Sequence, residues 1–159
     1  MKTTKTSTMI SLLFSLCLIF QSGASAQEKK LKMGQLPAAV RKTAQEQTKG
    51  ATIKSIVKEK ENGKTQYEVE TLVNGKNRDM IIDEDGTLAE VEQQVDLSTL
   101  SAEVQKGITD NAGTAKILII EAVSKGGNLE VYEVQIQKNG KKSGFQVKPD
   151  GSLVPKKKK

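Results

Sequence analysis

The sequence predicts the α+β fold class, arranged as two tandem repeats of one helix packed on a three- to four-stranded antiparallel sheet. The first observation is an internal repeat, because a set of residues recurs 65 positions later in the same order. The second is a helical spacing of apolar residues at the start of each copy. The third is a series of β-rich segments joined by Asn-Gly and Asp-Gly turns, which are typical of hairpins. The recurring sets are Tyr67-Glu68-Val69 with Tyr132-Glu133-Val134, Asn74-Gly75-Lys76 with Asn139-Gly140-Lys141, and Asp85-Gly86 with Asp150-Gly151.

Residues 1–26 have the three parts of a secretory signal peptide. They start with Lys2 and Lys5, continue with an apolar run of about 12 residues and end in a small-residue cleavage site at Ala24-Ser25-Ala26. We expect cleavage near Ala26 and export to the periplasm or the medium. A transmembrane helix needs about 20 apolar residues, so no membrane span is expected in the mature chain. The single cysteine lies within the apolar run, so the mature chain can form no disulfide.

The first repeat is expected over residues 36–92, after a basic N-terminal segment at 27–35. Leu36, Val40 and Ala44 lie at helical spacing, and Gly50 follows as a helix stop. The expected strands of this repeat are 51–59, 65–73 and 76–83.

The second repeat is expected over residues 100–155, after a linker at 93–99. Ser98 or Ser101 can cap a helix that reaches about Asn111. Because the linker is not rich in Gly, Ser or Pro, we expect the two halves to pack against each other. The expected strands are 115–123, 129–138 and 142–148.

Alternation within the strands predicts which sheet face is covered. Tyr67 and Val69 share one parity in the first repeat, as do Tyr132 and Val134 in the second, and this face should pack on the helices. The run at 117–120 breaks the alternation, which is typical of a strand covered on both sides, here at the junction of the repeats. The residues expected on the open, polar face are Glu68, Glu70, Glu133, Gln135 and Gln137.

The composition excludes much chemistry. With no histidine, the chain cannot build a Ser-His-Asp or Cys-His pair or an imidazole-ligated zinc site, so we expect no enzyme, no catalytic residues and no cofactor. Lys plus Arg number 25 against 19 Asp plus Glu, but the excess lies in the signal segment and two flanks, and the body is slightly acidic. Such runs are usually solvated, and without a basic stripe interleaved with aromatics we expect no nucleic-acid partner.

The lysine tail, residues 156–159, has three interpretations. Such a run is typical of a solvated chain end. It could also hold the protein near anionic envelope surfaces, or steer an acidic partner.

The plan of a helix followed by three antiparallel strands, with the Tyr-Glu-Val strands and the Asp-Gly turns quoted above, resembles the PepSY domain family. The tandem arrangement is similar to the PepSY-like group related to β-lactamase-inhibitor proteins, and the resemblance covers about residues 36 to 155. It implies a non-catalytic extracytoplasmic module that in some members inhibits a secreted peptidase and in others a β-lactamase. The chain departs from those inhibitors because it lacks tryptophan and disulfides, and tight interfaces rely on Trp, Tyr and Arg anchors.

A weak metal candidate lies around the first Asp-Gly turn. On a calcium-loop template, Asp83, Asp85 and Glu92 take ligand places, but Ile81 takes the first, where an oxygen is needed. The equivalent stretch of the second repeat keeps Asp150-Gly151 and loses the other acids, so turn geometry explains the motif.

Two functions remain open. The leading hypothesis is an exported, non-catalytic binding module that contacts a protein partner through the open sheet face, with a secreted peptidase as one candidate. The identity of that partner is unknown from the sequence. The alternative is a cation or small-ligand binding protein of the cell envelope that uses the acidic loop from Asp83 to Glu92.

Overall fold

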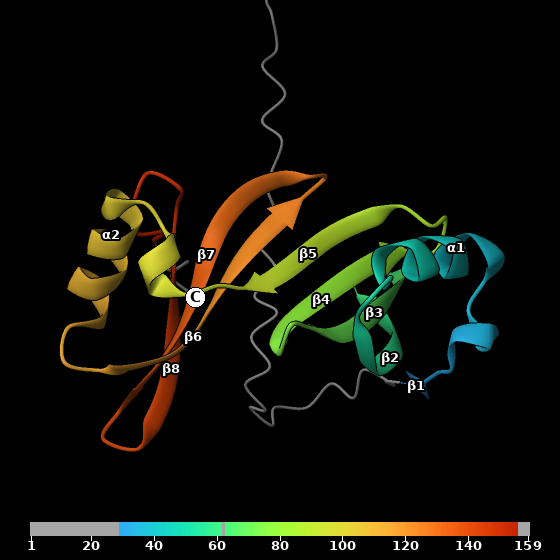
Figure 1. The fold of residues 1–159 in the computed structure, drawn as a ribbon, viewed down its shortest axis with the longest axis horizontal. Coiled ribbons are helices and arrows are strands. Elements are labelled where there is room, and N and C mark those ends of the chain that lie inside the picture. The colour runs from blue at the N-terminus through green and yellow to red at the C-terminus, as the bar shows by residue number, and fades with distance from the viewer. Residues whose placement is uncertain (1–28, 62, 156–159) are drawn as a thin grey trace, which may run out of the picture.

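The computed structural model describes residues 29–61 and 63–155, and it confirms the α+β class. Its main feature is an eight-stranded antiparallel sheet in which every strand pairs with the next one along the chain (Figure 1). The strands are β1 Lys29–Lys30, β2 Thr52–Glu61, β3 Lys64–Val73, β4 Lys76–Asp83, β5 Leu88–Gln94, β6 Lys116–Lys125, β7 Asn128–Lys138 and β8 Lys141–Val147. The helices are α1 Ala38–Gln47 and α2 Ala102–Ala112, preceded by the short 3₁₀ turns η1 Met33–Gln35 and η2 Leu97–Thr99. The predicted signal peptide at 1–26 and the lysine tail lie outside the described residues.

Each helix covers one half of the same sheet face. Val40 and Ala44 of α1 lie in one apolar cluster with residues of β2, β3 and β4, while Val104 and Ile108 of α2 lie in a second with residues of β6, β7 and β8. Tyr67 is buried in the first cluster and Tyr132 packs against the second, as the alternation predicted. The opposite face of the sheet carries many polar side chains, with buried valines such as Val123, opposite Glu92, among them.

Local sequence explains where the helices begin and end. The Ser101 hydroxyl accepts a hydrogen bond from the Val104 N–H at 3.3 Å, so Ser101 is the N-cap of α2, one of the two predicted choices. At the C-terminal end of α1, the Arg78 guanidinium donates hydrogen bonds to the backbone carbonyl and to the side-chain oxygen of Gln47, both at 2.9 Å. A cation at a helix C-terminus satisfies carbonyls that have no partner within the helix. Arg78 therefore caps the C-terminal end of α1 and joins it to β4.

The run at 117–120 breaks its alternation because β6 contains a bulge. The pairing of β6 with β7 shifts between Ile117 and Ile119, so Leu118 is the extra residue. This lets Ile117 and Ile120, three positions apart, both pack in the α2 cluster. β6 also pairs with β5, so this strand lies where the part of the sheet under α2 joins the part under α1.

The basic segment at 29–35 differs from the solvated run that its charge predicted. Lys29 and Lys30 form β1 on the edge of β2, and Leu31 donates its N–H to the Ile56 carbonyl at 2.8 Å. Leu31 and Met33 pack against the α1 cluster while the three lysines of this segment stay exposed. The alternation of apolar residues, and not the charge, decides the structure here.

The two Asp-Gly turns have the same hydrogen bonds. Asp83 N–H donates to Thr87 O and Gly86 N–H to Asp83 O, while Lys148 N–H donates to Ser152 O and Gly151 N–H to Lys148 O, all at 2.9 Å. Both glycines have positive φ, and both lie against the first half of a helix. The assignment of these motifs to turn geometry is confirmed.

This packing leads to a prediction for Gly107 in the interior of α2. Alanine normally stabilises a helix relative to glycine by about 1 kcal/mol. At position 107, however, a Cβ atom would lie 2.1 Å from the Gly151 carbonyl oxygen. We expect Gly107→Ala to destabilise the protein by about 1–3 kcal/mol in urea unfolding, because helix and turn must separate. The control is Gly34→Ala, whose Cβ would meet nothing within 4 Å. A stabilised Gly107→Ala protein would contradict the close contact.

Candidate partner-binding face

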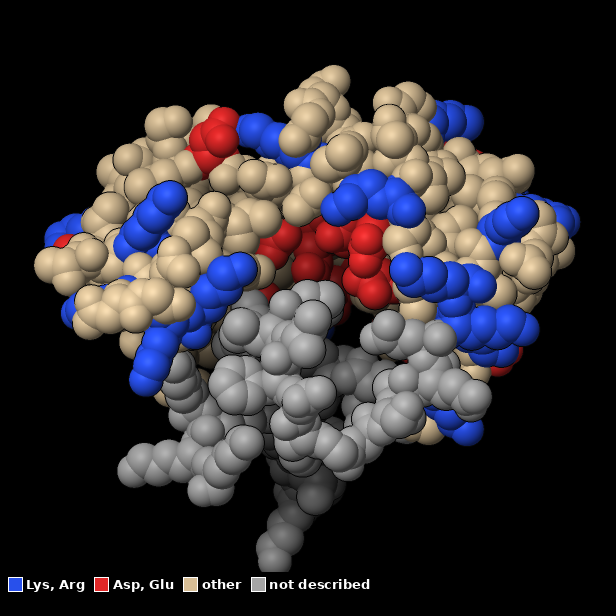
Figure 2. Space-filling model, turned by 90° about the horizontal axis from the view of Figure 1, so that it is seen from below, with Lys and Arg blue, Asp and Glu red and all other residues tan. Residues whose placement is uncertain are grey.

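The sheet face opposite the helices is hollowed and acidic (Figure 2). Carboxylate side chains gather in the recess, and lysine and arginine side chains lie around it. The carboxylates that interact electrostatically with one another, here named the acidic hollow, are Asp79 of β4, Glu90 and Glu92 of β5, Glu121 of β6 and Glu133 of β7.

Strand register brings these carboxylates together. Glu92 lies directly opposite Asp79, and Asp79 lies opposite Glu70 on β3. On the other half, Glu121 lies directly opposite Glu133. Residues opposite each other in antiparallel strands have Cβ atoms about 4.5–5.5 Å apart and point to the same face. The hollow thus places like charges on four successive strands.

Burial and like charge raise the pKa values in the hollow. Desolvation, followed by the charges of Glu133, Glu121, Glu90 and Asp79, raises the pKa of Glu92 to about 9. Desolvation, followed by Asp79 and Glu133, raises the pKa of Glu121 to about 7. Burial also raises the pKa of Asp79 and of Glu133. At neutral pH, Glu92 therefore holds its proton and Glu121 is partly protonated.

Three of the carboxylates have partners on neighbouring strands. Glu90 forms an ion pair with Lys125 at 2.9 Å between Oε2 and Nζ. Glu133 Oε1 accepts a hydrogen bond of 2.6 Å from Gln146 Nε2, and Asp79 Oδ1 accepts one of 3.2 Å from the Thr71 N–H. These contacts fix the side chains within the sheet, so the hollow is a formed part of the fold.

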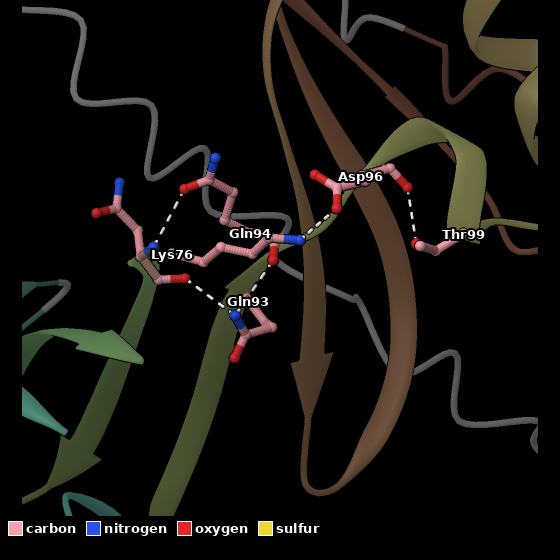
Figure 3. Close-up of polar contacts among 6 residues, drawn as sticks. Lys76, Gln93, Gln94, Asp96 and Thr99 are labelled. Atoms are coloured by element: carbon pink, nitrogen blue, oxygen red, sulfur yellow. Dashed lines mark hydrogen bonds and ion pairs between the residues drawn. The ribbon is translucent and has the colours of Figure 1, made fainter. Parts of the chain in front are cut away.

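A set of polar contacts holds the link between the two halves (Figure 3). Lys76 Nζ and Asp96 Oδ2 form an ion pair at 2.5 Å. Gln94 Oε1 accepts from the Asn77 N–H and Gln93 Nε2 donates to the Asn77 carbonyl, both at 3.1 Å. These contacts fasten the end of β5 to the start of β4. Because β5 also pairs with β6, the face is continuous from β3 to β8.

The predicted face residues fall into two groups on this surface. Glu68 and Glu70 lie on β3, and Glu133, Gln135 and Gln137 lie on β7, four strand spacings or about 19 Å away. Four of them are half-buried. The expectation that Glu133 is exposed is wrong, because the curved sheet places it in the recess, where it is 4% exposed.

Sequence reasoning did not place the residues between these two groups on this face. They are Asp79, Glu90, Glu121 and Glu92, the last of which was named only as a weak metal candidate. No strand was predicted over residues 88–94, although Glu90, Glu92 and Gln94 alternate with Ala89, Val91 and Gln93 as a half-buried strand should. This period of two is the signal that could have found them. The strand β5 carries the centre of the hollow.

The weak metal candidates do not converge. Asp85 Oδ1 accepts from the Thr87 N–H at 2.8 Å, a hydrogen bond that lowers the pKa of Asp85. Asp83 accepts from Gln66 at 2.9 Å and lies four residues, or about 13 Å, along β4 from Asp79, the cross-strand partner of Glu92. Within residues 29–61 and 63–155, no group of three or more Asp, Glu, His or Cys is arranged to hold a metal ion.

Residues 37–83, which form α1, β2, β3 and β4, match the PepSY family, described as "Peptidase propeptide and YPEB domain". The resemblance to this family is thus confirmed over this stretch, which contains the first Tyr-Glu-Val strand and ends just before the Asp85-Gly86 turn. No curated protein sequence matches the chain.

Solved structures resemble the whole fold. A proposed periplasmic protein from Bacteroides eggerthii has a TM-score of 0.63 at 14% identity, covering 76% of this chain and 86% of that one. A DUF2874 family protein from Bacteroides ovatus has a TM-score of 0.60 at 14% identity, covering 76% and 85%. A BLIP-like protein from Bacteroides fragilis has a TM-score of 0.58 at 14% identity, covering 76% and 84%. The chain therefore shares its fold with these Bacteroides proteins. Within the described residues, no helix is long and apolar enough to cross a membrane.

Proposed function

We propose that this chain is an exported, non-catalytic PepSY-like module that binds a protein partner through the open face of its sheet. The observation that carries the proposal is the acidic hollow, which is formed by carboxylates of four successive strands on the side away from the helices. A protein that gathers desolvated like charges on one face loses stability by doing so, so the arrangement favours a role in recognition.

The comparisons support the class of the function. The PepSY match carries the description of a peptidase propeptide, and a fold neighbour is BLIP-like, so a secreted peptidase is the partner that we propose to test first. Proposed periplasmic proteins among the neighbours support export, with the signal peptide removed near Ala26. Two tandem repeats, 36–92 and 100–155, joined by 93–99, are supported by the matching hydrogen bonds of the two Asp-Gly turns and by the residues that recur at a spacing of 65.

The partner should bind through charge. Arg78 caps α1, the two tyrosines face the helices, and the sequence has no tryptophan, so the face lacks the usual anchors of tight interfaces. We therefore expect binding of modest strength that weakens with salt. The face residues Glu68 and Glu70 of β3 and Gln135 and Gln137 of β7 flank the hollow, and we expect the partner to contact them as well.

Capture from an envelope fraction, followed by protein identification and a direct binding measurement, tests the proposal. The wild-type chain should retain a partner at low salt and lose it at about 0.5 M NaCl. Glu70→Lys reverses a charge directly opposite Asp79 of the hollow and should reduce affinity at least tenfold. Glu46→Lys, on the helix-covered side, should bind as the wild type does. Equal affinity of all three proteins would exclude this face as the binding site.

The cation alternative receives less support, since Asp83, Asp85 and Glu92 are separated. Calorimetry with calcium chloride tests it directly. Heat of binding that is lost in Asp83→Asn would favour the alternative.

A further inference from the structure

The acidic hollow suits several separate cations better than one. Its carboxylates span β4 to β7, three strand spacings or about 14 Å, and within the described residues they form no group able to hold a metal ion. Ammonium groups on a flexible chain can each approach a different carboxylate. A lysine-rich segment therefore fits the spread of charge.

Glu121 marks a place in the hollow where no described residue pairs with the carboxylate. It is 8% exposed, and within the described residues it makes no hydrogen bond or ion pair. No described side chain has a fully buried polar atom without a partner, so the Glu121 carboxylate must reach the open recess. A buried carboxylate that lies opposite Glu133 and is also affected by the charge of Asp79 is a site that a cation would stabilise.

The chain after β8 approaches this place. Leu153 pairs with Val147, and the Val154 N–H donates to the Gln146 carbonyl at 2.9 Å. Gln146 in turn lies opposite Glu133, to which it donates its side-chain hydrogen bond. Val154 therefore lies in the same cross-strand row as Glu133 and Glu121. Two strand spacings, about 10 Å, separate it from Glu133.

The residue after Val154 is proline, which has no N–H and cannot continue the pairing with β8. Four lysines follow directly. Four extended residues span about 13 Å, so their ammonium groups can reach both Glu133 and Glu121. We propose that the acidic hollow is the docking site of the chain's own lysine tail, residues 156–159, which fills it in the absence of a partner.

The inference rests on the proposed function in one respect: the tail occupies the face that a partner must reach, so it lowers the partner's affinity. Docking itself can be measured without any partner. The readout is the carboxyl pKa of Glu121 in the chain from Gln27 to Lys159, followed by carbon NMR at low ionic strength.

Replacing all four tail lysines by glutamine should raise the pKa of Glu121 by about one unit, a tenfold change in the acid dissociation constant, because the ammonium groups no longer favour the charged form. The difference should disappear at about 0.5 M NaCl. The control removes three lysines on the helix-covered side, Lys42→Gln, Lys49→Gln and Lys106→Gln, and should leave the pKa unchanged. Added tetralysine peptide should lower the pKa again in the tail variant.

An equal pKa of Glu121 in the wild type and the tail variant would overturn the proposal. A difference that vanishes on tenfold dilution would also overturn docking within one chain, because a second copy would then supply the tail. Partner capture separates the two proposals. If the tail variant shows the pKa change but no partner binds to either protein, the proposed function fails and the docking stands.

Discussion

Glu92→Gln should make the protein more stable at pH 8 and leave its stability almost unchanged near pH 4.5. Burial and four neighbouring carboxylates raise the pKa of Glu92 to about 9 in the folded state, whereas in the unfolded chain it returns to about 4.5. Between these values the folded protein holds one proton more than the unfolded chain, so the free energy of unfolding falls as the pH rises, by about 1.4 kcal/mol per pH unit. The amide has the same shape and no proton to lose.

We expect a gain of roughly 2–4 kcal/mol at pH 8, measured by urea unfolding across pH 4.5 to 9. Glu121, whose pKa is raised to about 7, should contribute the same kind of slope between pH 4.5 and 7, so Glu92→Gln removes only part of the decline. Glu46→Gln, an exposed carboxyl on α1, is the control and should follow the wild-type curve. Identical pH profiles for Glu92→Gln and the wild type would show that Glu92 is ionised in the fold.

Short-range signals explain why much of the fold could be predicted. Asn-Gly and Asp-Gly turns adopt the positive φ that those glycines allow, so the hairpins β3–β4 and β7–β8 and the turn after β4 follow from a few residues. The strands β1 and β5 were not predicted. The strand β1 pairs with β2, which is distant in sequence, and such pairing leaves no turn signal in the chain. The strand β5 follows β4 across the Asp85-Gly86 turn, but its pairing with β6 of the other half has no such signal.

Of the residues on the candidate face, only those on β3 and β7 were predicted from the sequence. Parity within one strand placed Glu68, Glu70 and Glu133 on the open face correctly. Whether a face is flat or hollow depends on the curvature of the whole sheet and on the pairing of β5 with β6, which joins the two halves. For this reason the exposure of Glu133 could not be deduced from parity, and Glu121 and Glu92 did not stand out from other charged strand residues.

Lys125→Met should destabilise the protein by about 2–3 kcal/mol at pH 8. Lys125 Nζ lies 2.9 Å from Glu90 Oε2, and the two side chains are 31% and 10% exposed. Loss of the cation leaves Glu90 desolvated beside Glu92 and takes away the charge that opposes the raised pKa of Glu133. The methionine fills the space of the lysine stem, so lost packing contributes little to the change in the free energy of unfolding.

The matched control is Lys106→Met, because Lys106 also pairs with a carboxylate, Asp110, but both side chains are more than half exposed. An exposed pair of this kind contributes about 0.3–0.5 kcal/mol, so the control should barely shift the unfolding curve. The effect of Lys125→Met should shrink as the pH falls, since protonation of the hollow removes the negative charge that the lysine neutralises. A loss that stays constant from pH 8 to pH 4.5 would mean that Lys125 acts by packing. A loss that falls with pH would identify Lys125 as the cation that permits these carboxylates to share one face.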